Sequence, residues 1–274
     1  MTIVAISREL GSGGNAIAAA VAKALNFEFV EREIILQAAH AYGVSEEKIT
    51  DVDERRLSLW ERFDEEKRRY LTFIEAAYFS LVERGGVVTA GRGGPFFLRG
   101  IGHALKVKVM APFDVRVRRV MEQNHVDERT AATRVRAYHR AICARIDFLF
   151  GLDWTRAENY DLVINTADNR WQFYTDLLVA AARHPQYQPT PESLQRIHDL
   201  SLAAQVRAAI ASDPTTKNLR VDVTAGAGRV VVKAMVFNPA LMDAAVEVAR
   251  RVPGVTQVSG EAVEIQPYYM GPVM

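Results

Sequence analysis

The stretch TIVAISRELGSGGNAIAAAV, from Thr2 to Val21, decides how the first part of this chain folds. Its β-branched run at residues 3–6 predicts a buried strand, and the glycine cluster Gly11–Gly14 predicts a tight turn. The alanine-rich amphipathic segment that follows, through Leu25, predicts a helix. This order places several backbone N–H groups at the positive end of a helix, where they favour a phosphate. A glycine cluster alone is equally typical of an ordinary turn, so its neighbours have to decide.

Composition limits the classes of function that fit the chain. Its 274 residues suffice for one large domain or two smaller ones, and its 34 basic and 33 acidic residues give a formal net charge of +1. This balance offers no overall attraction to nucleic acid or to a membrane surface. The single cysteine, Cys143, excludes an intramolecular disulfide and makes a cysteine-built zinc site implausible. Without a leader pattern or a long apolar stretch, we expect a cytoplasmic protein with no membrane span and no nucleic-acid partner.

Strand-like and helix-like segments alternate after the first helix. Helical spacing is present at Ile34–Tyr42, Leu71–Glu83 and about Trp171–Arg183. Apolar strand-like runs lie at Phe27–Val30, Val87–Ala90, Leu105–Met110 and Tyr160–Thr166. The densely charged stretch Asp51–Tyr70 predicts a helical insertion with a solvated face. The alternation predicts an α/β domain with a mostly parallel sheet.

An arginine-rich helix is predicted between Asp114 and Arg145. The segment contains no lysine and eight arginines, which are Arg116, Arg118, Arg119, Arg129, Arg134, Arg136, Arg140 and Arg145. The planar guanidinium suits bidentate contacts with phosphate oxygens and stays charged when water is excluded, so the bias indicates a phosphate clamp. A solvated helical face is the alternative. Because four acidic residues share the segment, we expect only two to four of the arginines to contact a ligand.

A second domain is predicted after a proline-rich linker. The stretch His184–Pro191 contains three prolines and no periodicity, which is typical of a stiff connection between domains. Beyond it, a helix, a β-hairpin, a helix and a final strand predict a small α+β unit, at Glu192–Ser212, Leu219–Val236, Pro239–Val252 and Val255–Ile265. The predicted organisation is therefore a domain at residues 1–184, a linker at 185–191 and a domain at 192–274.

With these motifs in view, the first domain resembles the cytidylate kinase-like family, a branch of the nucleoside monophosphate kinases within the P-loop fold. The motifs that carry the resemblance are Ala5–Gly14, Glu31–Glu33, Ala90–Gly93, Phe150–Trp154 and Tyr160–Thr166. The second domain resembles a BON domain in its element order and in the turn Val252–Val255. The resemblance implies a parallel-sheet, P-loop kinase-like domain with a helical insertion and a lid, followed by an α+β BON-like domain.

The resemblance also implies roles for particular residues. The residues that fall where such kinases hold the ATP phosphates are Gly11, Ser12, Gly13, Gly14 and Asn15. Arg32 and Arg92 fall where the acceptor phosphate is held, although Arg92 could instead be a structural residue that binds carbonyls at a strand end. The lid candidates are Arg116, Arg119, Arg136 and Arg140, and His139 stands where a lid acid is expected. The implied cofactors are ATP and Mg²⁺, the metal being held mainly by phosphates and water.

The loop departs from the Walker A pattern GxxxxGK followed by Ser or Thr. Arg8 occupies the first glycine position, Gly14 occupies the lysine position, and no hydroxyl residue follows. Since a cation at the transferring phosphate can contribute about a thousandfold or more, catalysis without one is expected to be slow. We expect Arg8 either to act as a catalytic residue that supplies this charge, or to pair with Glu9, Glu31 or Glu33 and fasten the loop.

Two functions fit these observations. The first is an ATP-dependent phosphotransferase that phosphorylates a nucleoside monophosphate such as CMP. The alternative is a nucleotide-binding regulatory module that has lost catalysis and signals through its BON-like domain. The six histidines lack ligand spacing, so we expect no metal site built from them. The BON-like domain is expected to bind a small ligand, a lipid or a protein, and the sequence does not choose among them. A homodimer is a further possibility that the sequence leaves open.

Overall fold

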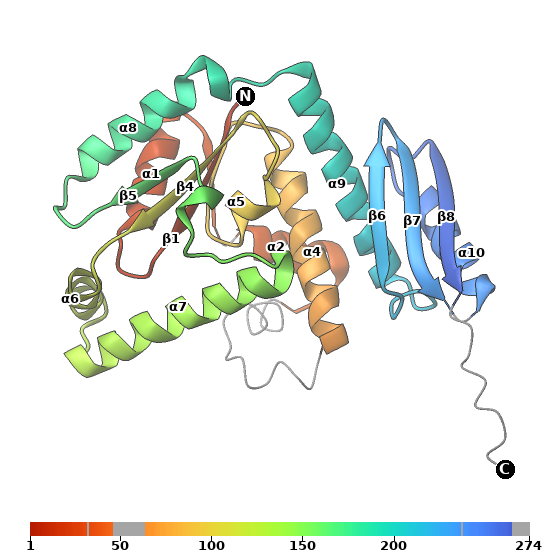
Figure 1. Ribbon diagram of the computed structural model, residues 1–274, viewed down its shortest axis with the longest axis horizontal. Coiled ribbons are helices and arrows are strands. Elements are labelled where there is room, and N and C mark those ends of the chain that lie inside the picture. The colour runs from red at the N-terminus through yellow and green to blue at the C-terminus, as the bar shows by residue number, and fades with distance from the viewer. Residues whose placement is uncertain (32, 46–63, 237, 265–274) are drawn as a thin grey trace, which may run out of the picture.

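The computed structural model describes residues 1–31, 33–45, 64–236 and 238–264, which form an α/β domain followed by a small mixed-sheet domain (Figure 1). The first domain is built on five strands: β1 (Ile3–Arg8), β2 (Glu28–Val30), β3 (Val87–Ala90), β4 (Ala104–Met110) and β5 (Leu162–Asn165). Their order is β2-β3-β1-β4-β5 and every neighbouring pair is parallel, which confirms the predicted fold class. Because β1 is central, the glycine loop that follows it lies in the middle of the sheet's carboxyl edge, where α/β folds bind ligands.

Helices cover both faces of this sheet (Figure 1). Successive side chains of a strand point to opposite faces, so Val4 and Ile6 of β1 pack toward α1 (Gly14–Leu25) and α8 (Trp171–Arg183). Ile3 and Ala5 pack on the opposite side. The helices of that side are α2 (Glu33–Tyr42), α4 (Asp64–Val82) and the short α5 (Gly94–Phe97). The two faces form two separate apolar cores with β1 between them.

The arginine-rich segment forms two helices rather than the single helix predicted. α6 spans Phe113–Asn124 and α7 spans Glu128–Phe150. His125 ends α6 in the left-handed conformation with φ 52°, and the side chain of Asp127 caps α7 by accepting a hydrogen bond from the Thr130 backbone N–H. The capping aspartate supplies a helix start within residues 120–128, a part of the arginine-rich segment that itself contains no arginine.

The second domain is a three-stranded sheet with two helices. Its elements are η3 (Pro185–Tyr187) in the predicted linker, then α9 (Pro191–Ser212), β6 (Val221–Gly226), β7 (Arg229–Val236), α10 (Pro239–Arg250) and β8 (Gln257–Glu264). β6 and β7 pair antiparallel, and β7 and β8 pair parallel. Val223, Val230 and Val232 face the apolar core under α9 and α10. The order helix, hairpin, helix, strand is the one predicted.

α9 joins the two domains because it is buried on two sides. Ile197 and Ala204 belong to the core of the first domain, whereas Leu202 and Val206 belong to the core of the second. α9 lies between α4 and the three-stranded sheet (Figure 1). The second domain is therefore docked on the first through α9, whereas the linker sequence is compatible with docked or independent domains.

Several other predictions concern helices. Five aromatic residues recur at helical spacing between Trp60 and Tyr78, which predicts a core or a dimer contact, and three of them, Tyr70, Phe73 and Tyr78, are buried inside the first domain. Trp60 and Phe63 lie outside the described residues, as does most of the predicted insertion. Among the helices that the structure describes, none combines the length and the apolar character needed to cross a bilayer.

Candidate functional site

The glycine loop lies between the end of β1 and the start of α1, and its conformation requires glycine. Gly11 and Gly13 have φ of 81° and 76°, and Gly13 is the N-cap of α1. A Cβ atom on Gly13 would lie 2.3 Å from the Trp171 ring, and one on Gly11 would lie 2.6 Å from the Arg116 carbonyl oxygen. The loop is further closed by Ser12, whose Oγ donates a hydrogen bond of 2.7 Å to the Glu9 carbonyl oxygen. The predicted strand, loop and helix are thus adjacent as expected.

Arg8 fastens this loop to the end of β2. Its guanidinium forms an ion pair of 2.8 Å with Glu31 Oε1, and its Nε donates a 2.6 Å hydrogen bond to Asn15 Oδ1. A third contact, 3.1 Å long, joins it to the hydroxyl oxygen of Tyr138 on α7. Of the three carboxylates considered as partners, Glu31 is therefore the one that Arg8 contacts. Glu33 instead accepts a hydrogen bond from the backbone N–H of Glu31.

A turn of three residues with positive φ follows β3 and carries Arg92. Gly91, Arg92 and Gly93 have φ of 83°, 55° and 79°, and Arg92 is therefore a non-glycine residue held in the left-handed region. Gly91 has a φ that favours glycine, and a Cβ there would lie 2.0 Å from an Arg8 guanidinium nitrogen. Backbone strain of this kind is common where a side chain is held for a ligand.

Positive charge converges on this turn. Burial, together with the nearby charges of Arg145 and Arg8, lowers the pKa of Arg92 to about 10. Guanidinium groups that repel one another in a partly desolvated place favour an anion between them. The second predicted acceptor residue, Arg32, lies outside the described residues.

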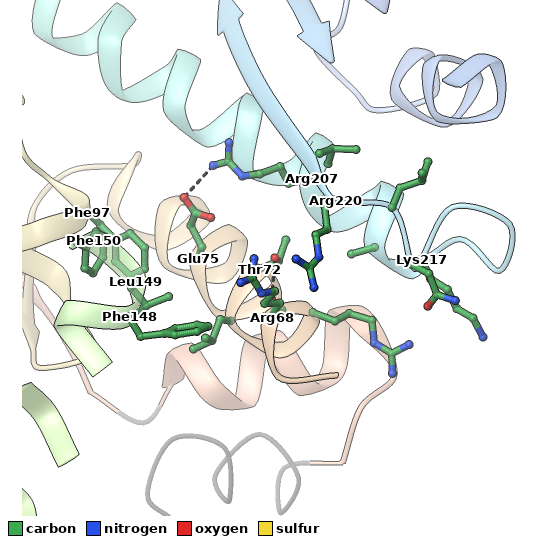
Figure 2. A pocket seen from close by; sticks show the side chains of 16 residues that line it. Arg68, Thr72, Glu75, Phe97, Phe148, Leu149, Phe150, Arg207, Lys217 and Arg220 are labelled. Carbon is green, nitrogen blue, oxygen red and sulfur yellow. Dashed lines mark hydrogen bonds and ion pairs between the residues drawn. The ribbon is translucent and has the colours of Figure 1, made fainter. Parts of the chain in front are cut away.

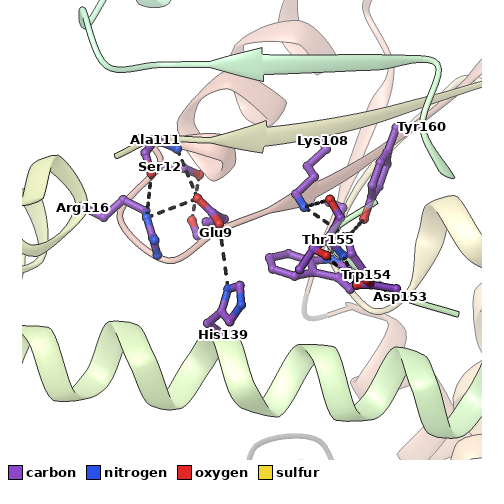
Figure 3. Close-up of polar contacts among 11 residues, drawn as sticks. Glu9, Ser12, Lys108, Ala111, Arg116, His139, Asp153, Trp154, Thr155 and Tyr160 are labelled. Atoms are coloured by element: carbon purple, nitrogen blue, oxygen red, sulfur yellow. Dashed lines mark hydrogen bonds and ion pairs between the residues drawn. The ribbon is translucent and has the colours of Figure 1, made fainter. Parts of the chain in front are cut away.

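Two of the four lid candidates hold the loop rather than face outward. Arg119 is buried and donates to the Gly11 carbonyl oxygen at 3.2 Å and to the Thr166 carbonyl oxygen at 2.6 Å. Burial also lowers the pKa of Arg119. Arg116 is buried too, and its Nε lies 3.2 Å from Glu9 Oε2 (Figure 3). Both side chains attach α6 to the loop, so neither has the mobility expected of a lid residue.

The other two lid candidates are exposed on α7. Arg136 and Arg140 line a cavity of about 410 Å³ between α6 and α7, together with Phe113 and His139. The Arg136 guanidinium carbon lies 4.7 Å from the centre of the Phe113 ring. Cations beside an aromatic face suit a ligand that has both negative charge and a planar group. These two arginines are therefore the exposed lid candidates, and the buried Arg116 lines the same cavity from α6.

Glu9 is a site residue that the sequence did not identify as an anchor. Its buried carboxylate accepts a 3.2 Å hydrogen bond from the Ala111 backbone N–H in addition to its ion pair with Arg116. His139 approaches the same carboxylate, with 3.9 Å between Nδ1 and Oε1 (Figure 3). Where the resemblance implies an acid at position 139, the nearby acid comes instead from the loop. The signal available in the sequence was a charged residue inside a glycine-rich turn.

Lys108 is a second site residue that sequence reasoning missed. It lies on β4, is only 4% exposed, and donates to the carbonyl oxygens of Trp154 and Thr155 at 3.1 and 3.3 Å (Figure 3). Its Nζ also lies 4.3 Å from the Trp154 ring, and burial lowers its pKa. The Trp154 indole N–H donates to Ser7 Oγ at 2.7 Å, so this cluster supports β1 just before the loop. The lysines that alternate with apolar residues in β4 were the signal.

The side chains that could bind a metal ion and the single cysteine were both candidates for chemistry at the site. Across residues 1–31, 33–45, 64–236 and 238–264, no three His, Cys, Asp or Glu side chains are grouped so that they could hold a metal ion. Two side-chain oxygens at the glycine loop and the start of α1 are engaged, since Ser12 Oγ donates to the Glu9 carbonyl oxygen and Asn15 Oδ1 accepts from Arg8. Cys143 packs in an apolar cluster, and burial raises the pKa of its thiol.

Comparison with known proteins supports these observations. A sequence model of the cytidylate kinase-like family matches residues 3–168, and one of the BON domain matches residues 198–266. A cytidylate kinase from Methanopyrus kandleri is 27% identical over 178 residues, which are 62% of this chain and 86% of that protein. A uronate isomerase from Corynebacterium glutamicum is 36% identical over 98 residues, but the match spans 36% of this chain and 19% of that protein. A crystal structure of an uncharacterized protein from Eubacterium ventriosum has the same fold over 66% of this chain and 98% of its own, with a TM-score of 0.51 and 20% identity.

Proposed function

The chain belongs to the cytidylate kinase-like family and contains a nucleotide kinase-like module, and we propose that this module transfers a phosphoryl group from ATP to a nucleoside monophosphate such as CMP. The observation that carries the proposal is the position of the glycine loop at the carboxyl end of the central strand. Positive charge flanks it, from the turn at Arg92 and from Arg136 and Arg140 of α7. Phosphoryl transfer depends mainly on such positioning and charge.

In this proposal the loop residues Gly11 to Asn15 hold the ATP phosphates. The backbone N–H groups at the start of α1 face the loop, and the helix dipole favours negative charge there. Mg²⁺ fits this site as a companion of the nucleotide, held mainly by phosphates and water, because the hydroxyl of Ser12 and the side-chain oxygen of Asn15 are already engaged. When bound, the metal would neutralise part of the phosphate charge.

The acceptor phosphate is assigned to the turn at Arg92, with Arg32 as its second partner. The partly desolvated Arg92 guanidinium, repelled by Arg145 and Arg8, gains a favourable interaction when an anion enters. Arg136 and Arg140 then neutralise the charge that develops on the phosphoryl group during transfer. Arg116 and Arg119 act as positioning residues, since they hold the loop in place.

The side chain of Arg8 lies beside position 14, where a Walker A loop has its lysine. A Cβ atom on Gly14 would lie 2.4 Å from the Arg8 Cβ, so the aliphatic part of Arg8 occupies the space in which a side chain at position 14 would begin. The Arg8 guanidinium would supply positive charge to the ATP phosphates if its ion pair with Glu31 broke and it contacted the phosphates instead. Replacement of Arg8 by Ala should then abolish nucleotide binding, whereas unchanged affinity would leave Arg8 with the fastening role alone.

The alternative function is a nucleotide-binding regulatory module that signals through the BON domain. The absence of a lysine at position 14 and the docking of α9 on α4 both favour it. We also retain as proposals the domain limits 1–184 and 192–274 with the linker at 185–191, and a cytoplasmic location suggested by the single cysteine. Neither a partner for the BON domain nor a homodimer is part of the proposed function.

A measurement of ADP formation separates the two functions. The full chain is incubated with ATP and Mg²⁺ and with CMP, dCMP, UMP, AMP or GMP, and ADP is quantified by chromatography. A kinase forms ADP only when its acceptor is present, and the acceptor becomes a diphosphate in equal amount. A regulatory module binds ATP in an equilibrium titration but forms no ADP with any of the five acceptors.

A further inference from the structure

A second cavity lies between the two domains, away from the glycine loop. It has a volume of about 320 Å³ and is lined by α4, by the end of α7, and by α9 with the chain that leads from it to β6 (Figure 2). The volume is at the lower end of the range for small-molecule sites. It contains none of the residues assigned above to ATP, the acceptor or the lid, so the inference does not rest on the proposed kinase activity.

The lining of this interdomain cavity is strongly basic. Its basic side chains are Arg68, Arg69, Arg207, Lys217 and Arg220, and among the described lining residues Glu75 is the one acid. Glu75 is already paired, because its Oε1 lies 2.8 Å from the Arg207 guanidinium (Figure 2). The Nε of Arg69 is buried without a hydrogen-bond partner among the described residues. Among the described lining residues, basic side chains therefore outnumber acidic ones, a composition that favours an anionic ligand.

An aromatic surface forms the other part of the lining. Phe97, Phe148 and Phe150 lie together on one side of the cavity (Figure 2). The Arg68 guanidinium carbon lies 5.6 Å from the centre of the Phe148 ring, which shows that a cation and an aromatic face meet inside the site. Phosphate alone would use only the basic part of such a surface. A ligand with an aromatic group would use both parts.

We propose that the interdomain cavity binds a small, soluble phosphate ester that carries a planar aromatic group. Arginine donors from both domains, Arg68 on α4 and Arg220 ahead of β6, approach the phosphate from opposite sides, because both line the cavity and Arg220 extends toward α4 (Figure 2). The aromatic group of the ligand packs on the phenylalanines. Since each domain supplies part of the site, the ligand binds only while the domains are docked.

Phenyl phosphate is the probe that tests this site, titrated calorimetrically into the full chain. The double variant Arg68→Gln/Arg220→Gln removes one exposed guanidinium from each domain. The matched control is Arg99→Gln/Arg229→Gln, which makes the same change at two exposed positions, again one in each domain, outside the cavity. Circular dichroism verifies that both variants fold, and the binding that remains in the first variant measures phenyl phosphate held elsewhere.

The proposal predicts that the first variant binds phenyl phosphate at least tenfold more weakly, while the control stays within twofold of the unmodified chain. Inorganic phosphate should bind the unmodified chain at least fivefold more weakly than phenyl phosphate. Equal affinity in the two variants would overturn the site, and equal affinity of the two probes would overturn its aromatic part. Binding to vesicles that contain phosphatidic acid, without binding of phenyl phosphate, would overturn the soluble ligand class.

Discussion

The Nε atom of Arg116 lies 3.2 Å from Oε2 of Glu9, and both side chains are only about 10% exposed. This buried pair joins α6 to the loop that follows β1. The exposed arginines on α7 are not attached to the loop in this way. Arg116 is therefore held at the loop, whereas Arg136 and Arg140 lie exposed on α7.

Replacement of Glu9 by Gln is expected to lower the free energy of unfolding by roughly 3 kcal/mol, because it leaves the buried charge of Arg116 without a counter-ion. Chemical denaturation followed by circular dichroism measures the change. Glu122→Gln is the control, since Glu122 lies exposed on α6, the helix that carries Arg116. If both variants were equally stable, Glu9 would not anchor α6.

Replacement of Gly91 by Ala is expected to destabilise the protein by about 1–3 kcal/mol more than replacement of Gly100 by Ala. Both glycines have positive φ, 83° and 76°, so the backbone strain of alanine is similar at the two positions. A Cβ on Gly91 would lie 2.0 Å from an Arg8 guanidinium nitrogen, whereas a Cβ on Gly100 would meet nothing within 4 Å. Thermal unfolding of the two variants gives the comparison. Equal losses would mean that the contact with Arg8 gives way without cost.

The double variant Arg136→Gln/Arg140→Gln should reduce phosphoryl transfer about a hundredfold or more and leave the stability within about 0.5 kcal/mol, because both side chains are exposed and act on the ligand. Initial rates at saturating acceptor measure the effect. Arg129→Gln/Arg134→Gln removes the same charge from exposed positions of the same helix and should leave the rate unchanged. A similar loss in both variants would point to the helix's overall charge instead of the cavity.

Lys108 should make the stability depend on pH. Burial lowers its pKa in the folded state, so between that lowered value and the ordinary value of 10.5 the unfolded chain binds more protons. The free energy of unfolding of the unmodified protein should then rise with pH in this window relative to Lys108→Met. Urea denaturation at several pH values up to 10 measures the difference, with Lys23→Met, at an exposed position, as control. A difference that did not change with pH would show that Lys108 titrates normally.

Much of the fold was predictable because the periodicity is strong. The run Ile3–Ile6 and the glycines after it predict a buried strand and a helix start, and α8 and β7 have the predicted bounds. The break at His125 was missed because the arginine pattern was extended across residues 120–128, which contain no arginine. The left-handed conformation of His125 and the capping contact between Asp127 and Thr130 mark the break.

The site was less predictable because it depends on which charges meet. The sequence offered three carboxylates as partners for Arg8, and packing of β2 beside β3 brings Glu31 to it while Glu9 turns to Arg116. The resemblance grouped four lid arginines that the structure divides into two buried and two exposed. The alternation of lysines with apolar residues placed Lys108 in a strand, but its role at the site was missed because its partners are backbone carbonyls.

Transfer of label from γ-³²P-ATP tests the central claim most directly. The full chain is incubated with labelled ATP, Mg²⁺ and CMP, and the nucleotides and inorganic phosphate are separated. The proposed function predicts that label appears in CDP, in the same amount as the ADP formed and only when CMP is present. Label that stays in ATP despite ATP binding and with every acceptor tested, or label released as inorganic phosphate regardless of acceptor, would contradict a nucleoside monophosphate kinase.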